Sequence, residues 1–215
     1  MALNIEIAQL RKEYKAETLS EKEADTDAIK QFEKWWKEAM KSQAEEVNAM
    51  TLATCNGKGY PSARIVLLKG FSDEGFIFFT NYESRKGMEL QQTPYACLVF
   101  FWKELERQVR IEGEVKKISR EESDEYFSLR PFGSRLSAWS SPQSKIIETR
   151  EILESNVDHY SQVFADGNIP RPEHWGGYIV KPFVIEFWQG RANRLHDRLQ
   201  YTTTPQGWHI DRLAP

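Results

Sequence analysis

Segments with a two-residue hydrophobic period dominate this sequence and constrain its fold more than any other feature. In the cleanest of them, residues 108–117, Val109, Ile111, Gly113 and Val115 would share one face of a β-strand. Other strand-like segments are 49–55, 61–69, 75–80, 95–102, 176–188, 191–203 and 207–213. Helical patterns occupy 27–43, 84–92, 119–129 and 146–164, without a regular strand–helix alternation. The chain is therefore predicted to be mainly β, of the α+β class, an antiparallel barrel with peripheral helices.

The N-terminal 26 residues differ from the rest of the chain, because they are polar and rich in charge. We expect a partly mobile arm over residues 1–26 and a single domain over residues 27–215. A chain of 215 residues can bury roughly 70% of its unfolded surface without a disulfide or a metal. The domain should begin with an amphipathic helix, because apolar residues including Trp36 and Met40 recur at spacings of three and four.

Composition and charge exclude several classes of protein. The balance of 29 Lys and Arg against 32 Asp and Glu gives a net charge of −3, and no polybasic segment indicates nucleic-acid binding. No apolar run approaches the roughly 18 residues of a membrane span, and the start of the chain lacks the apolar core of a signal peptide. Cys55 and Cys97 form no CxxC pair, and the four histidines show no metal-ligand spacing. We expect a cytoplasmic protein with reduced thiols and no metal site.

The sharpest local signal is the segment from Arg194 to Arg198, which reads RLHDR. If it is a strand, Arg194, His196 and Arg198 lie on one face. Two guanidinium groups and an imidazole, shortly after Phe187 and Trp188, suit a planar anionic ligand. A solvated strand face with salt bridges explains the same pattern.

Basic residues also frame two other segments. In residues 64–69, RIVLLK, they bracket four aliphatic residues, although a buried strand with charged ends would look the same. Arg85 and Lys86 follow Ser84, the expected N-cap of a short helix. Cations there oppose the helix dipole, and a bound anion would make them easier to tolerate.

A third group of donors lies around Pro131. Ser119 and Glu122 form a capping box for a helix whose Tyr126 and Arg130 stand one turn apart, and Ser134 follows in the expected loop. The three donors can bind a phosphate. A tyrosine packed under an arginine stem is the simpler alternative for this group alone.

Taken in order, these segments resemble the pyridoxine 5′-phosphate oxidase (pyridoxamine-phosphate oxidase) family. The resemblance runs from about residue 10 to the C-terminus and rests on RIVLLK, FFTN with SRK, ERQV, YF before RP, QS, FWQG, RLHDR and the terminal WHIDRLAP. It implies an FMN-binding split β-barrel that works as a homodimer. It also implies an oxidoreductase acting on a CH–NH2 group, the pyridoxal 5′-phosphate synthase of vitamin B6 biosynthesis and salvage. Such enzymes oxidise pyridoxamine or pyridoxine 5′-phosphate to pyridoxal 5′-phosphate, with O2 as acceptor and H2O2 released.

The resemblance also assigns residues to sites. The FMN site would take Arg64, Ile65, Val66, Leu67, Leu68, Lys69, Phe79, Thr80, Arg85, Lys86, Gln108, Gln143, Ser144, Trp188 and Arg198. The substrate would be bound by Arg11, Tyr14, Lys69, Tyr126, Arg130, Ser134, Arg194 and His196. Of these, Arg194 and His196 are the catalytic candidates, because they would face the pyridine ring. The cofactor carries the redox chemistry, so the protein needs no acid–base dyad for hydride transfer.

Two departures and two alternatives qualify this assignment. The family often has Tyr where this chain has Phe79, so a hydroxyl contact is lost there. The segment after Tyr14 lacks the basic cluster that often follows the arm, which puts a secondary ligand site in doubt. The same barrel would also suit a non-catalytic carrier of pyridoxal phosphate, or a reductase that uses a nicotinamide cofactor. Peroxide release with pyridoxamine phosphate and an NADH-oxidation assay separate these alternatives.

Overall fold

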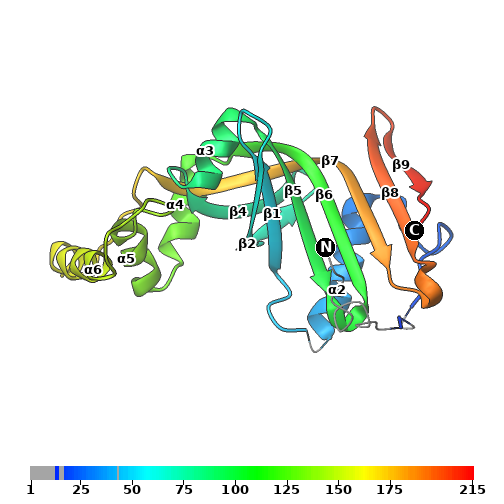
Figure 1. Cartoon of the computed structure of the whole chain (residues 1–215), viewed down its shortest axis with the longest axis horizontal. Helices are drawn as coiled ribbons and strands as arrows, with labels where there is room; N and C mark the ends of the chain where they lie inside the picture. The colour runs from blue at the N-terminus through cyan, green and yellow to red at the C-terminus, as the bar shows by residue number, and fades with distance from the viewer. Residues whose placement is uncertain (1–12, 15–16, 43) are drawn as a thin grey trace, which may run out of the picture. The chain divides into compact units, whose positions relative to one another are not determined.

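The computed structural model describes residues 13–14, 17–42 and 44–215, which fall into two compact units (Figure 1). Unit 1 takes in Met1–Val47, Val99–Ile111 and Phe183–Pro215. Unit 2 takes in Asn48–Leu98 and Glu112–Pro182. The three strands that run through both ranges are β5 (Tyr95–Trp102), β6 (Arg107–Lys117) and β7 (Trp175–Gln189). The expected single domain over residues 27–215 stays a prediction.

Unit 2 is built on an antiparallel hairpin and the strands that extend it. Its own strands are β1 (Ala49–Cys55), β2 (Pro61–Leu67), β3 (Gly70–Ser72) and β4 (Gly75–Asn81). The strand order is β2-β1-β5-β6-β7-β4-β3. The β1–β2 hairpin is confirmed, and its register pairs Leu52 with Arg64 and Thr54 with Ser62. The short strand β3, which pairs with β4, was not expected from the sequence.

The alternation predicted for residues 108–117 is confirmed in β6. Buried and half-buried residues alternate along it, and Val109 and Ile111 are fully buried. Gly113 lies on the same face, where a Cβ atom would stand 2.4 Å from the backbone oxygen of Lys181. The close approach of β6 to its neighbour β7 therefore requires a glycine at this position.

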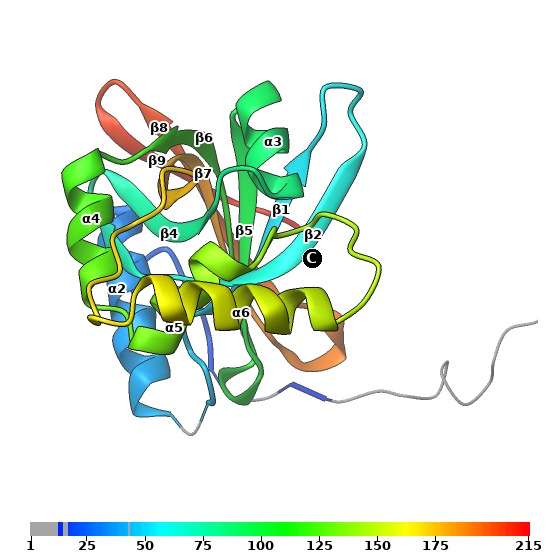
Figure 2. The ribbon, with the colours of Figure 1, turned by 90° about the vertical axis from the view of Figure 1, so that its left-hand side faces the viewer.

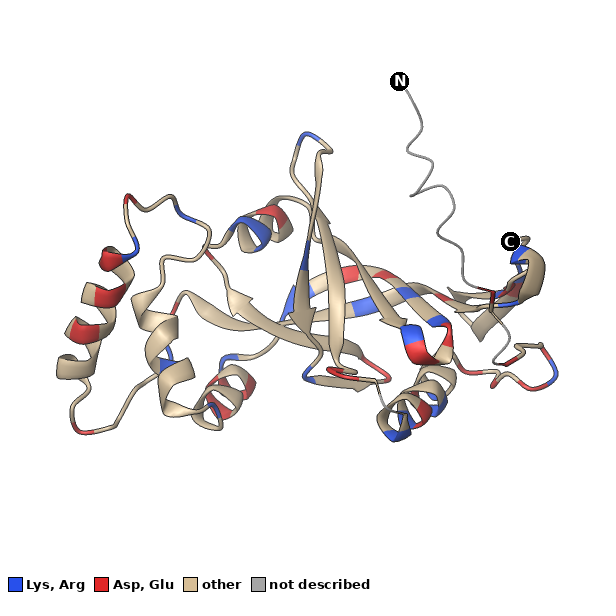
Figure 3. Ribbon diagram, turned by 60° about the horizontal axis from the view of Figure 1, so that its bottom comes forward, with Lys and Arg blue, Asp and Glu red and all other residues tan. Residues whose placement is uncertain are grey.

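The helices of unit 2 are α3 (Arg85–Gln92), α4 (Arg120–Ser128), α5 (Phe132–Ser140) and α6 (Glu151–Val163). Ser84 caps α3 and the predicted capping box of Ser119 and Glu122 starts α4. Figure 2 shows α5 and α6 lying side by side, and acidic positions recur along α6 in Figure 3. None of the described helices is long and apolar enough to cross a membrane.

Two sequence expectations in this region were wrong. The segment after Pro131 is helix α5 rather than a loop, so Ser134 stands in its first turn. The helix forms because Leu136 is buried in an apolar cluster with Phe127, Ile169 and Trp175. The next helix begins only at residue 151 rather than at 146, and Ile146 is fully exposed.

Unit 1 contains α2 (Ala28–Lys41), the second half of β7, β8 (Asp197–Thr204) and β9 (Gly207–Arg212). Helix α2 is confirmed, and Asp27 caps it by accepting hydrogen bonds from two backbone N–H groups. Its buried face includes Trp35 rather than the expected Trp36, and Met40 is exposed. The Trp35 ring meets Phe187 edge-on at 5.2 Å, which is core packing.

The expected strand over 191–203 begins only at Asp197. A single turn of 3-10 helix, η2 (Ala192–Arg194), precedes it, and Asn193 and Arg194 have positive φ angles of 56° and 62°. Residues in the left-handed conformation cannot continue a strand, because their φ angles lie outside the β region. The inference that Arg194, His196 and Arg198 share one strand face was therefore wrong.

Candidate functional site

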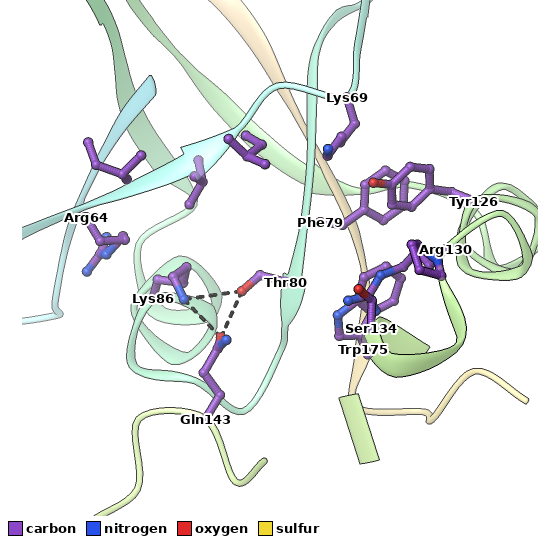
Figure 4. Close-up of a pocket in the computed structure, with 14 residues that line it drawn as sticks. Arg64, Lys69, Phe79, Thr80, Lys86, Tyr126, Arg130, Ser134, Gln143 and Trp175 are labelled. Carbon is purple, nitrogen blue, oxygen red and sulfur yellow. Dashed lines mark hydrogen bonds between the residues drawn. The ribbon is translucent and has the colours of Figure 1, made fainter. Parts of the chain in front are cut away.

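A cavity of about 460 Å³ opens within unit 2 (Figure 4). Its walls come from β2, β4, α3, α4, α5 and the start of β7. The lining residues are Arg64, Ile65, Val66, Leu67, Lys69, Phe79, Thr80, Lys86, Tyr126, Arg130, Pro131, Ser134, Gln143 and Trp175. All of them except Pro131 and Trp175 were predicted from the sequence. The fold thus brings predicted cofactor-binding and substrate-binding residues to one cavity.

One end of this cavity is formed by Lys86, a buried lysine in the first turn of α3. Its Nζ donates to Gln143 Oε1 at 3.0 Å and Thr80 Oγ1 at 3.3 Å. In the part of the chain that the structure describes, the ammonium meets only neutral oxygens. Burial lowers the pKa of Lys86, and the charge of Arg64 lowers it further. A buried cation with neutral partners is costly, and an anionic ligand would relieve that cost.

Arg64 stands on β2 at the same side of the cavity (Figure 4). Its Nη1 donates to Leu52 O at 3.2 Å and to Thr54 Oγ1 at 2.5 Å. Its Nη2 donates to Ser62 Oγ and lies 3.4 Å from Glu89 Oε2. Burial lowers the pKa of Arg64, and Glu89 counteracts this. The guanidinium is therefore held on several sides and presents one fixed orientation.

The other side of the cavity is an aromatic stack beneath an arginine. Phe79 stacks on Tyr126 with centroids 3.9 Å apart and on Trp175 at 5.4 Å. The Arg130 guanidinium lies 4.5 Å above the Trp175 ring. Its Nη1 is buried and has no hydrogen-bond partner among the described residues. Burial lowers the pKa of Arg130. Ser134 lies beside it in Figure 4, so donors converge here as the sequence predicted.

Three predicted residues of unit 2 do not line this cavity. Leu68 is buried. The side chain of Arg85 is 62% exposed, and its Nε donates to Glu89 Oε1 at 2.9 Å. Ser144 is exposed, with a positive φ of 69°.

The second group of predicted residues belongs to unit 1 and, among the described residues, comprises Tyr14, Gln108, Trp188, Arg194, His196 and Arg198. The His196 ring packs against Trp188 at 4.6 Å and against Tyr14 at 5.9 Å. Its Nδ1 accepts the backbone N–H of Arg191 at 3.0 Å. Burial lowers the pKa of His196, and the charge of Arg194 adds to this. The neutral ring therefore carries its proton on Nε2, where it can donate to a ligand.

Arg198 and Gln108 complete the described residues of this group. Arg198 Nε donates to the buried Glu186 at 2.8 Å, and its Nη1 donates to Ala214 O. The hydrogen bond to Glu186 raises the pKa of Arg198. Gln108 is half-buried on β6. The predicted Arg11 lies outside the described residues.

Sequence reasoning missed two residues that contact the cations of the cavity. The Trp175 ring lies beneath the Arg130 guanidinium and extends the aromatic stack. Glu89 joins Arg64 to Arg85. The spacing of four between Arg85 and Glu89 signalled their ion pair. Nothing in the sequence signalled the contact of Glu89 with Arg64, because it depends on how α3 packs on the hairpin.

Comparisons with known proteins agree with this arrangement. A family model described as pyridoxamine 5′-phosphate oxidase matches residues 36–164. A second, described as the pyridoxine 5′-phosphate oxidase C-terminal dimerisation region, matches residues 175–215. The chain is 55% identical to a pyridoxine/pyridoxamine 5′-phosphate oxidase of Cyanothece sp., over 99% of this chain and 100% of that protein. It is 56% identical to that of Salinibacter ruber, over 97% and 99%.

Two solved structures are similar as well. PhzG from Burkholderia lata 383, in complex with tetrahydrophenazine-1-carboxylic acid, gives a TM-score of 0.87 at 28% identity, over 93% of this chain and 99% of that one. A pyridoxamine 5′-phosphate oxidase-related, FMN binding protein from Nostoc punctiforme gives 0.69 at 18% identity, over 89% and 100%. The latter likeness concerns the fold alone. The predicted fold class, a mainly β split barrel with peripheral helices, is confirmed.

Proposed function

The chain belongs to the pyridoxine/pyridoxamine 5′-phosphate oxidase family, and we propose that it is an FMN-dependent oxidase that produces pyridoxal 5′-phosphate. Its substrates are pyridoxamine 5′-phosphate and pyridoxine 5′-phosphate, and O2 is reduced to H2O2. With the amine substrate, ammonia is also released. The enzyme serves the biosynthesis and salvage of vitamin B6.

The observation that carries this proposal is a cavity with two separate cationic groups. Lys86 and Arg130 lie on different sides of it in Figure 4. Lys86 is buried among neutral oxygens, and Arg130 has a buried Nη1 without a partner among the described residues. Each position favours a dianionic phosphate, because unpaired buried cations are costly. FMN and a phosphorylated pyridine supply two such groups, so the residues present fit the cofactor.

We assign the residues to roles on the basis of the family resemblance, and their positions around the cavity support these roles. Lys86, Thr80 and Gln143 hold the FMN phosphate, with Arg64 and Arg85 adding positive charge. Lys69, Tyr126, Arg130 and Ser134 hold the substrate phosphate. Bound FMN supplies the two-electron redox chemistry. The protein itself binds and orients the reacting groups, which alone is worth a large part of a rate enhancement.

The second group of residues is assigned to the ring systems. Arg194 and His196 contact the pyridine ring, and the Nε2–H of His196 donates a hydrogen bond to it. Gln108, Trp188 and Arg198 contact the flavin. Ser144 and Leu68 remain assigned to the flavin site, and Arg11 and Tyr14 to closing over the substrate.

The enzyme works as a homodimer in this proposal. The match to a C-terminal dimerisation region supports it. So do the apolar side chains of Tyr95 and Phe101, each of which is 54% exposed on β5. A second copy would cover such surface. Light scattering should give twice the chain mass of 25.1 kDa for the FMN-bound protein.

The experiment that tests the function is a turnover assay on the purified protein. We expect an absorbance band at about 450 nm from bound flavin, and denaturation should release this flavin as FMN. Pyridoxine 5′-phosphate should yield pyridoxal 5′-phosphate with one H2O2 per turnover. Binding of pyridoxal 5′-phosphate without peroxide would indicate a carrier, and NADH oxidation would indicate a reductase.

A further inference from the structure

Glu89 is a buried carboxylate beside the cavity to which the proposed function gives no role. It is 4% exposed on α3. Its Oε2 accepts hydrogen bonds from Thr54 Oγ1 at 2.5 Å and Ser62 Oγ at 2.6 Å. Its Oε1 accepts from Arg85 Nε at 2.9 Å, and Arg64 Nη2 approaches Oε2 at 3.4 Å. Two strands and one helix therefore meet at this group.

The hydrogen bonds around Glu89 run in one direction. Arg64 donates hydrogen bonds to the hydroxyl groups of Thr54 and Ser62. Each hydroxyl has a single proton and donates it in a hydrogen bond to Glu89. A hydroxyl that donates to a carboxylate is a better acceptor for the guanidinium. The carboxylate thus orders the hydroxyls, and the hydroxyls order Arg64.

The ionisation of Glu89 agrees with this arrangement. Burial alone would raise its pKa, but hydrogen bonds from Ser62, Thr54 and Arg85, together with the charge of Arg64, lower the pKa to about 2. The group is charged at neutral pH. Its location is fixed as well, because Gly87 brings α3 against the backbone of Tyr82, where a Cβ atom would stand 2.1 Å from the carbonyl oxygen.

We propose that Glu89 is a positioning residue for the FMN phosphate: it fixes the guanidinium groups of Arg64 and Arg85 beside Lys86 and thereby strengthens phosphate binding. The inference rests on the proposed function. Two physical effects oppose each other here. A carboxylate near a phosphate repels it, whereas a carboxylate that orients cations removes the entropic cost of ordering them on binding. The orienting effect dominates, because Glu89 does not itself line the cavity, whereas Arg64, which it contacts, does.

The test compares flavins with and without a phosphate. Full-chain protein, stripped of flavin, is titrated with FMN and with riboflavin, and Kd is read from the quenching of flavin fluorescence. In Glu89→Gln, we expect the Kd for FMN to rise about tenfold or more, as when an outer partner of a metal ligand is removed. The Kd for riboflavin should change by no more than about twofold, because riboflavin has no phosphate to contact.

The matched control is Glu83→Gln. Glu83 lies just before α3, is 59% exposed and forms an ion pair with Lys145 at 3.2 Å. The substitution removes the same charge close to the same helix without touching Arg64 or Arg85. It should leave the Kd for FMN within about twofold. If Glu89→Gln does not fold, Thr54→Val removes one of the linking hydroxyls and should weaken FMN binding in the same direction, by less.

The outcomes separate the two levels of the proposal. Wild-type protein that binds riboflavin as tightly as FMN overturns the phosphate site itself. If wild type prefers FMN and Glu89→Gln binds it equally well or more tightly, the positioning role of Glu89 is wrong. An equal rise in Kd for FMN and riboflavin would show that Glu89 has a structural role only. A loss confined to FMN supports the proposal.

Discussion

Replacing Lys86 by methionine should make the flavin-free protein more stable than wild type and the FMN-bound protein less stable than wild type. Lys86 is 9% exposed, and the oxygen partners of its ammonium group in the described chain are uncharged. Without Lys86, Thr80 Oγ1 still donates to Gln143 Oε1 at 3.2 Å, so neither group is left unsatisfied. Removing the buried charge should raise the free energy of unfolding by about 1 kcal/mol, at the low end for replacing buried ionic groups by apolar ones.

The same substitution removes a charge-assisted contact to phosphate, which is worth roughly 1.5–3 kcal/mol. The Kd for FMN should therefore rise about 10- to 150-fold. At an FMN concentration of about 100 times the wild-type Kd, binding stabilises wild type by about 2.7 kcal/mol and the variant by only about 0.3–1.4 kcal/mol. The order of stability should reverse between the flavin-free and the FMN-saturated proteins.

Urea denaturation with and without FMN, and FMN titration by fluorescence, measure both effects. Lys58→Met is the matched control, because Lys58 is exposed in the β1–β2 turn. It should change neither quantity measurably. An unchanged Kd for FMN in Lys86→Met would show that Lys86 does not bind the FMN phosphate. A flavin-free variant less stable than wild type would show that the ammonium supports the fold, and would refute the argument from burial.

The remaining predictions concern packing, the substrate phosphate and pH. Gly113→Ala should destabilise the protein by about 1–3 kcal/mol in urea denaturation, because β7 leaves no room for a methyl group. Gly133→Ala, with nothing within 4 Å of its Cβ, should instead be neutral or stabilising by up to about 1 kcal/mol, and equal effects would refute the distinction. Trp175→Leu should raise KM for pyridoxine 5′-phosphate about 5- to 30-fold, since a desolvated cation–π contact is worth about 1–2 kcal/mol. An unchanged KM would show that Arg130 does not need the indole. Glu89 has its pKa lowered from 4.5 to about 2, so its contribution to stability is present above about pH 4.5 and lost as pH falls towards 2. Urea denaturation across that range should show a shallower pH dependence for Glu89→Gln than for wild type, and parallel curves would contradict this.

Features that depend on neighbouring residues were read correctly from the sequence. The alternation along β6, the Ser84 cap of α3 and the capping box of Ser119 and Glu122 are all confirmed. Each is set within a few residues, because side chains alternate along any strand and a cap satisfies N–H groups one turn away. The resemblance to a known family supplied the site residues, and most of those assigned to unit 2 line one cavity.

Features that depend on tertiary packing were missed or misjudged. The segment after Pro131 has a loop-like composition, yet it is helical because Leu136 is buried against Trp175 and Phe127. The segment before Asp197 has a strand-like pattern, yet Asn193 and Arg194 adopt left-handed conformations.

The site itself shows the same division between sequence and structure. The sequence by itself determined which cations this protein carries and, through the family resemblance, the kind of ligand they suit. The tertiary structure alone decided how those cations are held: Arg64 by Glu89 across 25 residues of sequence, and Arg130 on Trp175 across the fold. No local pattern encodes such contacts, because they exist only after α3 has packed on the hairpin and β7 has paired with β4.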